Sequence, residues 1–408
     1  MPIKWKKAPR FKPAVILKKI DSVRSTNPGI LSTPFSDFEL ADCLPALHSM
    51  LEFPATAAEV DVSNLVWSGL AKVGKELTPE TFLAAINQEL KDLLATKEQT
   101  YSFLTTISLY SGDIPKKLNI LGTEIHFLLG DFAPRFHSRE ALLRENPVPT
   151  PPTPHHYCKV VVKTKAKSPS GAVNKALRAL DLQRALWCLM GNPSMQITFG
   201  TPAYSPINVV RLGSQHTLHI STGERATDVI WYEPGFVETN IHRIAKPDDV
   251  KRNSRWALRQ VAASRYGERL ISALIRYVRA LDEREANTAF LRLWGAVEAL
   301  TTPGQADYEK TVQRCSFLFK ESDFHRQLLE HLREYRNANV HAGEESERAR
   351  THCFQLQLYF ANLIWFHLQN ARFFVSLDEA NFFLDSPANH EGLKRRLDLA
   401  RKAVRFAA

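Results

Sequence analysis

The sequence predicts an α+β protein in which a mixed N-terminal domain precedes an all-helical C-terminal domain. The chain has 408 residues, which is more than one domain usually contains. Its hydrophobic pattern changes from strand-like alternation to helical periodicity near residues 246–253. We therefore expect a basic flexible arm over 1–35, an α+β domain over 36–248 and a helical domain over 249–408.

Composition and charge narrow the class of protein. The hydrophobic share of 44% and the charged share of 24% are ordinary for a globular protein. The formal net charge of +10 favours an anionic partner. Much of the excess lies at the two ends of the chain, either as solvated tails or as a binding surface. The candidate binding residues are Lys4, Lys6, Lys7, Arg10, Lys394, Arg395 and Arg396.

The first half of the chain carries both helical and strand signals. Residues 79–95 keep helical spacing of apolar side chains, whereas 101–110 and 121–129 are typical of strands. The segment 146–156 is rich in proline, which removes backbone donors and fixes φ, so it should be a loop. We expect these elements to belong to the mixed domain.

After the proline-rich loop the same mixture continues. A strand is expected over 157–165 and a helix over 172–190. Shorter strand-like segments separated by Gly and Pro turns follow, at 195–199, 207–212, 216–220 and 228–232.

Helical periodicity dominates the remainder of the chain. It predicts a bundle with helices over 255–281, 283–300, 308–319, 324–341 and 347–375. The run 353–371 has no formal charge and raises the question of a membrane span. Its Gln, Asn and His residues would be costly in hydrocarbon, so we expect a buried helix of a bundle or dimer and no membrane.

No signal for export, disulfides or a cofactor stands out. The N-terminus lacks the apolar core of a signal peptide, so a cytoplasmic location is the expectation. Five scattered cysteines fit neither a disulfide framework nor a metal site. Because no phosphate-loop, nucleophile-elbow or zinc-protease motif is present, we expect no cofactor and no metal.

The segment 328–343 carries the most informative polar residues. Arg336, Asn337 and His341 form the pattern Arg-polar-x3-His at the end of a predicted helix. On a regular helix Asn337 and His341 share a face, but Arg336 lies about 140° away from His341. Arg336 can flank the histidine only if the helix end distorts or if a second copy of the chain approaches. A two-fold dimer would place two arginines and two histidines around one phosphate.

An upstream helix offers an acidic partner. Apolar residues from Phe290 to Leu300 form a helical stripe, and Glu298 borders it. A carboxylate near a core needs a cation, and Arg336 or Arg314 could supply it. The alternative is that Arg336 pairs with Glu330, Glu334 or Glu298 for structural reasons alone.

The order FLRLWGAVEAL, KTVQRCSFLF, LREYRNANVHAG and then a long hydrophobic helix resembles the Apea-like branch of HEPN domains over about 285–375. Many HEPN domains are metal-independent endoribonucleases of bacterial defence or toxin systems, and many act as dimers. The resemblance implies the same activity and a dimer for this chain. It marks Arg336 and His341 as catalytic, Asn337 as a polar accessory and Glu298 as a supporting acid. One departure is Ala342, where relatives commonly have glycine.

Together these inferences predict an endoribonuclease that cleaves tRNA or mRNA. RNA carries its own 2′-OH nucleophile, so an imidazole can move the proton and a guanidinium can stabilise the phosphate. The α+β domain would sense a trigger, the helical domain would form a homodimer and the basic ends would bind RNA. Two alternatives remain open: a non-catalytic HEPN module that binds RNA or protein, and a helical protein that binds a small molecule or nucleotide.

Overall fold

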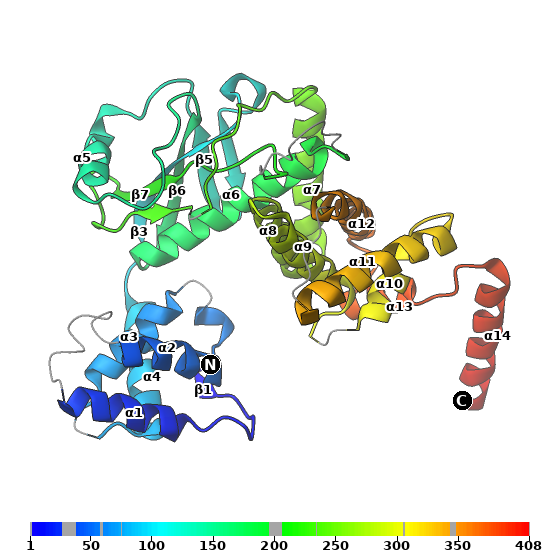
Figure 1. Ribbon diagram of the computed structural model, residues 1–408, viewed down its shortest axis with the longest axis horizontal. Coiled ribbons are helices and arrows are strands. Elements are labelled where there is room, and N and C mark those ends of the chain that lie inside the picture. Colours follow the sequence, from blue (N-terminus) through cyan, green and yellow to red (C-terminus); the bar gives the residue numbers. More distant parts are fainter. Residues whose placement is uncertain are drawn as a thin grey trace.

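The computed structural model describes residues 2–26, 38–57, 60–74, 76–195, 206–233, 235–304, 307–342 and 348–407. At 341 and 342 the description covers the backbone helix and not the side chains. Helices surround a six-stranded antiparallel sheet, so the fold is α+β as predicted (Figure 1).

The N-terminal part of the chain is a helical unit with its own hydrophobic core. Two short antiparallel strands and four helices build it: β1 (Lys4–Trp5), α1 (Pro13–Thr26), α2 (Phe38–Met50), β2 (Leu51–Glu52), α3 (Val62–Lys72) and α4 (Pro79–Ala95). A short 3₁₀ turn, η2 (Ala55–Ala57), precedes α3. The core runs in sequence from Ile3 to Leu90.

The prediction of a flexible arm over 1–35 was wrong for its described part, because β1 and α1 lie there. Pro13 occupies the first helical position, where a missing N–H costs nothing, so it begins a helix where we expected a break. Leu17 and Ile20 are at most 1% exposed and join the core of the unit. Residues 27–35 lie outside the described residues.

The predicted helix over 79–95 is confirmed as α4. Thr78 caps its N-terminus by accepting from the Thr81 N–H, and the Thr81 hydroxyl in turn accepts from the Thr78 N–H. Phe82, Ile86 and Leu90 are buried on one face.

The sheet has the strand order β4-β5-β6-β3-β7-β8, with every pairing antiparallel. Its strands are β3 (Gln99–Ile107), β4 (Lys117–Ile120), β5 (Thr123–Phe127), β6 (Cys158–Ala166), β7 (Gln215–Ile220) and β8 (Trp231–Tyr232). Both faces are covered. Phe103 and Val160 pack toward the long helix α6 (Pro169–Gly191), whereas Leu104 and Val161 pack on the opposite face against Phe136. Phe136 belongs to η4 (Pro134–Phe136), which precedes α5 (Ser138–Glu145); η3 (Ser111–Asp113) links β3 to β4.

The segment 207–212 is not the strand that its alternation predicts. Its backbone groups bond elsewhere: the amides of Ile207 and Asn208 donate to the Leu281 carbonyl, and the Arg211 amide donates to Ser108 Oγ. A single bridge from Leu212 to Ile107 is its only ladder contact in the part that the structure describes. Most of the expected strand 195–199 lies outside the described residues.

The C-terminal part is helical, as predicted, with α7 (Pro247–Ala263), α8 (Gly267–Leu281), α9 (Ala286–Thr301), α10 (Tyr308–Ser316), α11 (Ser322–Ala342), α12 (Ala349–Gln369), α13 (Leu377–Leu384) and α14 (His390–Ala407). The single helix expected over 255–281 is two helices. They part at Gly267, where a β-carbon would collide with the Val261 carbonyl oxygen. Only glycine allows the chain to turn so closely there.

Helix α12 is a buried helix, as expected for the uncharged run. Leu356, Phe360, Leu363 and Ile364 are each 0% exposed. None of the helices that the structure describes combines the length and apolar character needed to span a membrane. All five cysteines are buried and free, so they are residues of the core.

The main hydrophobic core does not break at residue 248. One continuous cluster runs from Tyr101 in the sheet, through α6 and α8, to Leu384 in α13. Helix α6, which precedes the predicted boundary, contributes Ala179, Leu182 and Leu186 to this core. The sheet and the C-terminal helices are therefore packed as one body.

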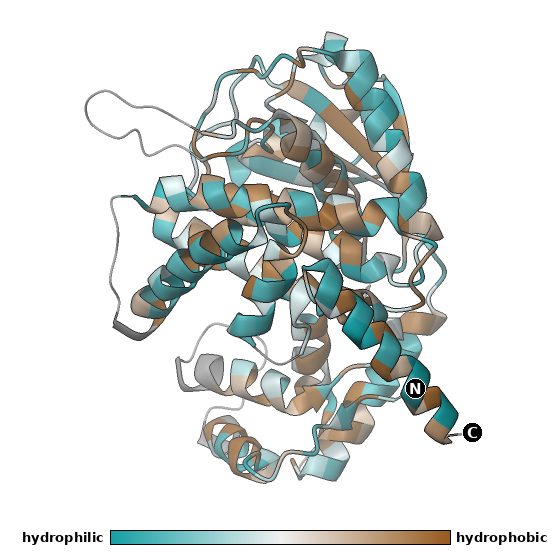
Figure 2. Ribbon diagram, turned by 90° about the vertical axis from the view of Figure 1, so that its right-hand side faces the viewer, coloured by the Kyte–Doolittle hydropathy of each residue, from teal (hydrophilic) through white to brown (hydrophobic). Residues whose placement is uncertain are grey.

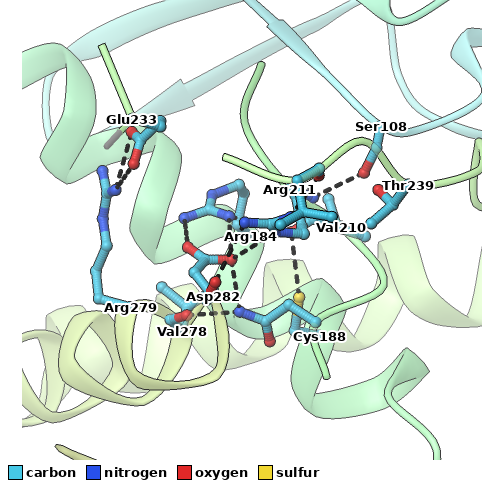
Figure 3. Close-up of polar contacts among 12 residues, drawn as sticks. Ser108, Arg184, Cys188, Val210, Arg211, Glu233, Thr239, Val278, Arg279 and Asp282 are labelled. Carbon is cyan, nitrogen blue, oxygen red and sulfur yellow. Dashed lines mark hydrogen bonds and ion pairs between the residues drawn. The ribbon is translucent and has the colours of Figure 1, made fainter. Parts of the chain in front are cut away.

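A buried charge cluster reinforces this junction (Figure 3). Arg184 Nη1 and Nη2 donate to the two carboxylate oxygens of Asp282 at 3.2 and 2.8 Å, and Arg184 also bonds Asp181. Arg279 bridges Asp181 and Glu233. Arg211 Nε lies 3.7 Å from Asp282. The cluster thus balances three arginines against three carboxylates: Arg184, Arg211, Arg279, Asp181, Glu233 and Asp282.

Helix α14 stands away from the rest of the molecule (Figure 1). It has no buried residue, and Leu397, Val404 and Phe406 are 51%, 70% and 95% exposed. Hydrophilic and hydrophobic segments alternate along it (Figure 2). Arg396 lies over the Phe382 ring at 4.4 Å and donates to Ser386 Oγ at 2.9 Å, which ties the start of the helix to α13.

Candidate functional site

Arg336 lies on α11 with its guanidinium stacked on an aromatic ring. Its central carbon is 4.4 Å from the centroid of Tyr308, the first residue of α10. Nη1 also lies 3.4 Å from Oδ1 of Asn337, its neighbour in sequence. Stacking on a ring holds a guanidinium in place without neutralising its charge. Arg336 and Asn337 are half-buried, so they are fixed and still accessible.

The carboxylates near Arg336 in the sequence are engaged elsewhere. Glu330 and Glu334 lie 3.0 and 3.5 Å from Arg333 Nη2. Among the described residues no carboxylate forms an ion pair with Arg336. The structural ion pair considered as an alternative for Arg336 is therefore not the arrangement found.

Glu298 does not serve Arg336 or Arg314 as its partner in this structure. Its carboxylate accepts from the indole N–H of Trp294 at 2.8 Å, one turn earlier on α9. Arg314 instead forms a two-bond pair with Asp385, at 2.7 Å for each bond. The expected pairing was wrong because the indole donor on the same helix is closer in sequence and already fixed by the core. Glu298 positions a tryptophan.

His341 lies on α11, one residue before its end, and its side chain lies outside the described residues. The helix is continuous from Ser322 to Ala342, with no distortion of its hydrogen-bonding pattern at Arg336. A five-residue step on such a helix separates the two positions by about 140°. Its catalytic role stays a prediction.

A histidine pair beside the motif was missed at the sequence level. His331 Nε2 on α11 lies 3.3 Å from His352 Nε2 on α12, and Tyr335 packs on His352 with ring centroids 4.5 Å apart. The Tyr335 hydroxyl donates to Asn287 Oδ1 on α9. His352 is 6% exposed, and burial, helped by His331 and Arg348, lowers its pKa to about 4. His352 is therefore uncharged at neutral pH. Through Tyr335 and Asn287 it connects α12 with α11 and α9 next to Arg336.

Sequence spacing could not reveal this pair. The two histidines are 21 residues apart on different helices. The step from Arg326 to His331 repeats the Arg-x4-His spacing, but Arg326 points to Glu309 at 3.7 Å and plays no part in the pair.

Tyr308 connects Arg336 with a surface hollow. The hollow has a volume of ≈ 690 Å³, and Lys310, Arg314, Asp378 and Phe382 also line it. Its charges are mixed. The ring that supports the Arg336 guanidinium therefore also borders a space in which part of a ligand could lie.

The basic ends do not gather around this site. Lys4, Lys6, Lys7 and Arg10 belong to the N-terminal unit, where Lys6 Nζ donates to the Ser49 carbonyl and Arg10 lies over the Phe11 ring. Lys394, Arg395 and Arg396 lie at the start of α14. Figure 1 shows the N-terminus and α14 well apart from each other.

The buried charge cluster is the other concentration of perturbed titratable groups. Such groups often mark functional sites. Here Arg184 is 0% and Asp181 3% exposed, so neither can meet a substrate. Burial opposes the charge of Asp282, but Arg184, Arg211 and Arg279 still hold its pKa below the usual range. The cluster is a structural element.

In the described ranges, no group of three or more His, Cys, Asp and Glu side chains is arranged to hold a metal ion. No family model, curated protein or solved structure matches the chain.

Proposed function

We propose that this protein is a metal-independent endoribonuclease in which Arg336 stabilises the scissile phosphate and His341 transfers the proton. The observation that carries the proposal is the state of Arg336. It is the arginine of the predicted motif, it is held on the Tyr308 ring at 4.4 Å, and no carboxylate neutralises it among the described residues. A fixed guanidinium without an anion is suited to bind a phosphate.

The chemistry needs few groups. The 2′-OH of the ribose loses its proton to an imidazole and attacks the adjacent phosphorus. The bond from phosphorus to the 5′-oxygen breaks, and an imidazolium donates the proton that this oxygen takes up. Arg336 would stabilise the negative charge that develops on the phosphorane. The products are a 2′,3′-cyclic phosphate and a 5′-hydroxyl. Asn337, four residues before His341, shares its helix face and would orient the phosphate.

The regular geometry of α11 favours a composite site. Because the helix does not distort between Arg336 and His341, the two positions lie about 140° apart around the helix axis in one copy. A homodimer related by a two-fold axis would bring Arg336 of one copy toward His341 of the other. Sedimentation of the full chain tests this, since a purely monomeric protein that still cleaves RNA would contradict the composite site.

Cleavage is tested by incubating the full chain with mixed tRNA and mRNA in EDTA. We expect cleavage of RNA and not of DNA, with loss of roughly 2 to 4 powers of ten in rate for Arg336→Ala and for His341→Ala. Arg333→Ala is the matched control, because Arg333 lies on the same helix and already pairs with Glu330 and Glu334. Cleavage that survives both motif substitutions would remove the assignment. Binding without cleavage would favour the non-catalytic alternative.

The cellular role would be anti-phage defence or toxin-like growth arrest, with the N-terminal domain responding to a trigger. Induced expression should then stop bacterial growth, or reduce phage plating, for the wild type and not for Arg336→Ala. Equal growth and equal plating for the two proteins would argue against this role.

A further inference from the structure

A second concentration of positive charge lies away from the two ends of the chain. Three adjoining hollows of ≈ 920, 690 and 530 Å³ lie between the β4–β5 hairpin, α6, α7 and α8. Asn119 lines all three, and Arg259 and Glu268 each line two, so the hollows form one continuous depression. We call it the α7 groove.

The lining of the α7 groove is strongly basic. Four carboxylates, Glu98, Glu124, Asp248 and Glu268, face nine cationic side chains: Lys163, Lys165, Lys175, Arg178, Lys251, Arg252, Arg255, Arg259 and Arg265. This excess of five positive charges is half of the formal net charge of +10. Some cations are neutralised locally, for example Arg178 by Glu268 at 2.5 Å and Arg252 by Asp249 at 2.8 Å.

Helix α7 supplies cations at regular spacing. Lys251, Arg255 and Arg259 follow one another at four-residue steps and line the same hollow. Each step advances about 6 Å along the helix, so the three charges form a row about 12 Å long. Arg255 and Arg259 are exposed, and no carboxylate pairs with any of the three in the part of the chain that the structure describes. Evenly spaced unpaired cations suit a polymer with repeating negative charge.

We propose that the α7 groove binds the phosphate backbone of RNA. The choice of RNA as the polyanion rests on the proposed function, whereas the groove itself rests on the side chains above. Contacts to phosphates position a nucleic acid without reading its sequence. The groove would thus supply affinity while α11 supplies chemistry.

The groove exposes very little hydrophobic surface, which argues against a membrane as its ligand. Peripheral membrane helices insert large apolar side chains between lipids. Helix α7 has no exposed large hydrophobic residue, and Leu121 at the hairpin tip, 46% exposed, is the single one in the lining. Helix α14 has the opposite character, with several exposed apolar side chains beside its basic ones.

The test compares two triple substitutions of equal charge in the full chain, on a His341→Ala background that prevents cleavage. One set removes the α7 row, as Lys251→Ala, Arg255→Ala and Arg259→Ala. The other removes three cations of α14 that are not among the candidate binding residues, as Arg401→Ala, Lys402→Ala and Arg405→Ala, all exposed. Binding of a short labelled single-stranded RNA is measured by fluorescence anisotropy over a range of salt concentrations in EDTA, and circular dichroism checks that each variant is folded.

Each phosphate contact contributes about 0.7 to the slope of log K against log salt on a single strand. Removal of three contacts should therefore lower the slope by about 2 and weaken binding about 100-fold at 0.1 M salt. The α14 set should change affinity by less than about 3-fold, as for charges outside the contact area. Equal loss in both sets would show that net charge governs binding and would overturn the α7 groove. So would tighter binding to phosphatidylserine vesicles than to RNA, or retention of RNA binding by the α7 set.

The outcome is separable from that of the catalytic proposal. RNA binding that depends on the α7 row, with no cleavage by the wild type, would remove catalysis and leave the groove. Cleavage by the wild type, with binding unaffected by the α7 substitutions, would remove the groove and leave catalysis.

Discussion

Replacement of Asp282 by asparagine tests the buried charge cluster. Asp282 accepts two bonds from Arg184, at 3.2 and 2.8 Å, and Arg184 is 0% exposed. The wild-type cluster balances three arginines with three carboxylates. Asp282→Asn keeps the shape of the side chain and leaves one buried positive charge without a counter-ion. Breaking a buried pair in this way should lower the free energy of unfolding by about 3–5 kcal/mol.

Urea denaturation of the full chain, followed by circular dichroism, measures this loss. Glu145→Gln is the control, because it removes an exposed pair with Arg225 at 2.7 Å and should cost no more than about 1 kcal/mol. The double variant Asp282→Asn with Arg184→Met restores equal numbers of buried charges, so it should be more stable than Asp282→Asn alone. A loss below about 1 kcal/mol for Asp282→Asn, or a double variant weaker than the single one, would refute the reasoning.

Three more predictions concern the helices around the candidate site. The pKa of His352 falls from 6.5 to about 4 on folding. The folded state therefore binds fewer protons than the unfolded state in this range. The contribution of His352 to the free energy of unfolding is fully present above pH 6.5, and up to about 3 kcal/mol of it is lost as the pH falls to 4. His352→Phe should flatten this part of the curve of urea stability against pH, and an unchanged slope would contradict it. Gly267→Ala should lower the melting temperature, because the new β-carbon would clash with the Val261 carbonyl. Gly295→Ala in α9 has open space around its β-carbon, so it should raise the free energy of unfolding by up to about 1 kcal/mol and raise the melting temperature. Equal melting temperatures for the two variants would contradict both predictions. Glu298→Gln keeps an acceptor for the Trp294 indole, so RNA cleavage should stay near the wild-type rate, and a loss of ten-fold or more would show a direct role for the carboxylate.

Local signals in the sequence predicted local structure well. The helix over 79–95 was predictable because Thr78, Pro79 and the spacing of Phe82, Ile86 and Leu90 all favour it. The same reasoning misjudged Pro13, since proline either begins or breaks a helix, and the later apolar residues Leu17 and Ile20 decide between these outcomes.

Features that depend on distant partners were not predictable. Arg184 and Asp282 are 98 residues apart, and nothing near either residue marks it as half of a buried pair. The placement of Arg336 on Tyr308 likewise follows from how α10 and α11 pack. The bond between Glu298 and Trp294 is instead local, since the two residues lie one turn apart on α9. By contrast, the four-residue spacing of Lys251, Arg255 and Arg259 was visible in the sequence, although only the fold shows that a groove lies beside it.

The continuous core from Tyr101 to Leu384 limits how the protein can be divided for experiments. A shortened chain that begins at residue 249 would remove α6, which packs against α8 and contributes Ala179, Leu182 and Leu186 to the shared core. It would also remove Arg184, the buried counter-charge of Asp282. Such a fragment should aggregate, so a failure of the isolated helices to cut RNA would say nothing about the proposed activity of the full chain.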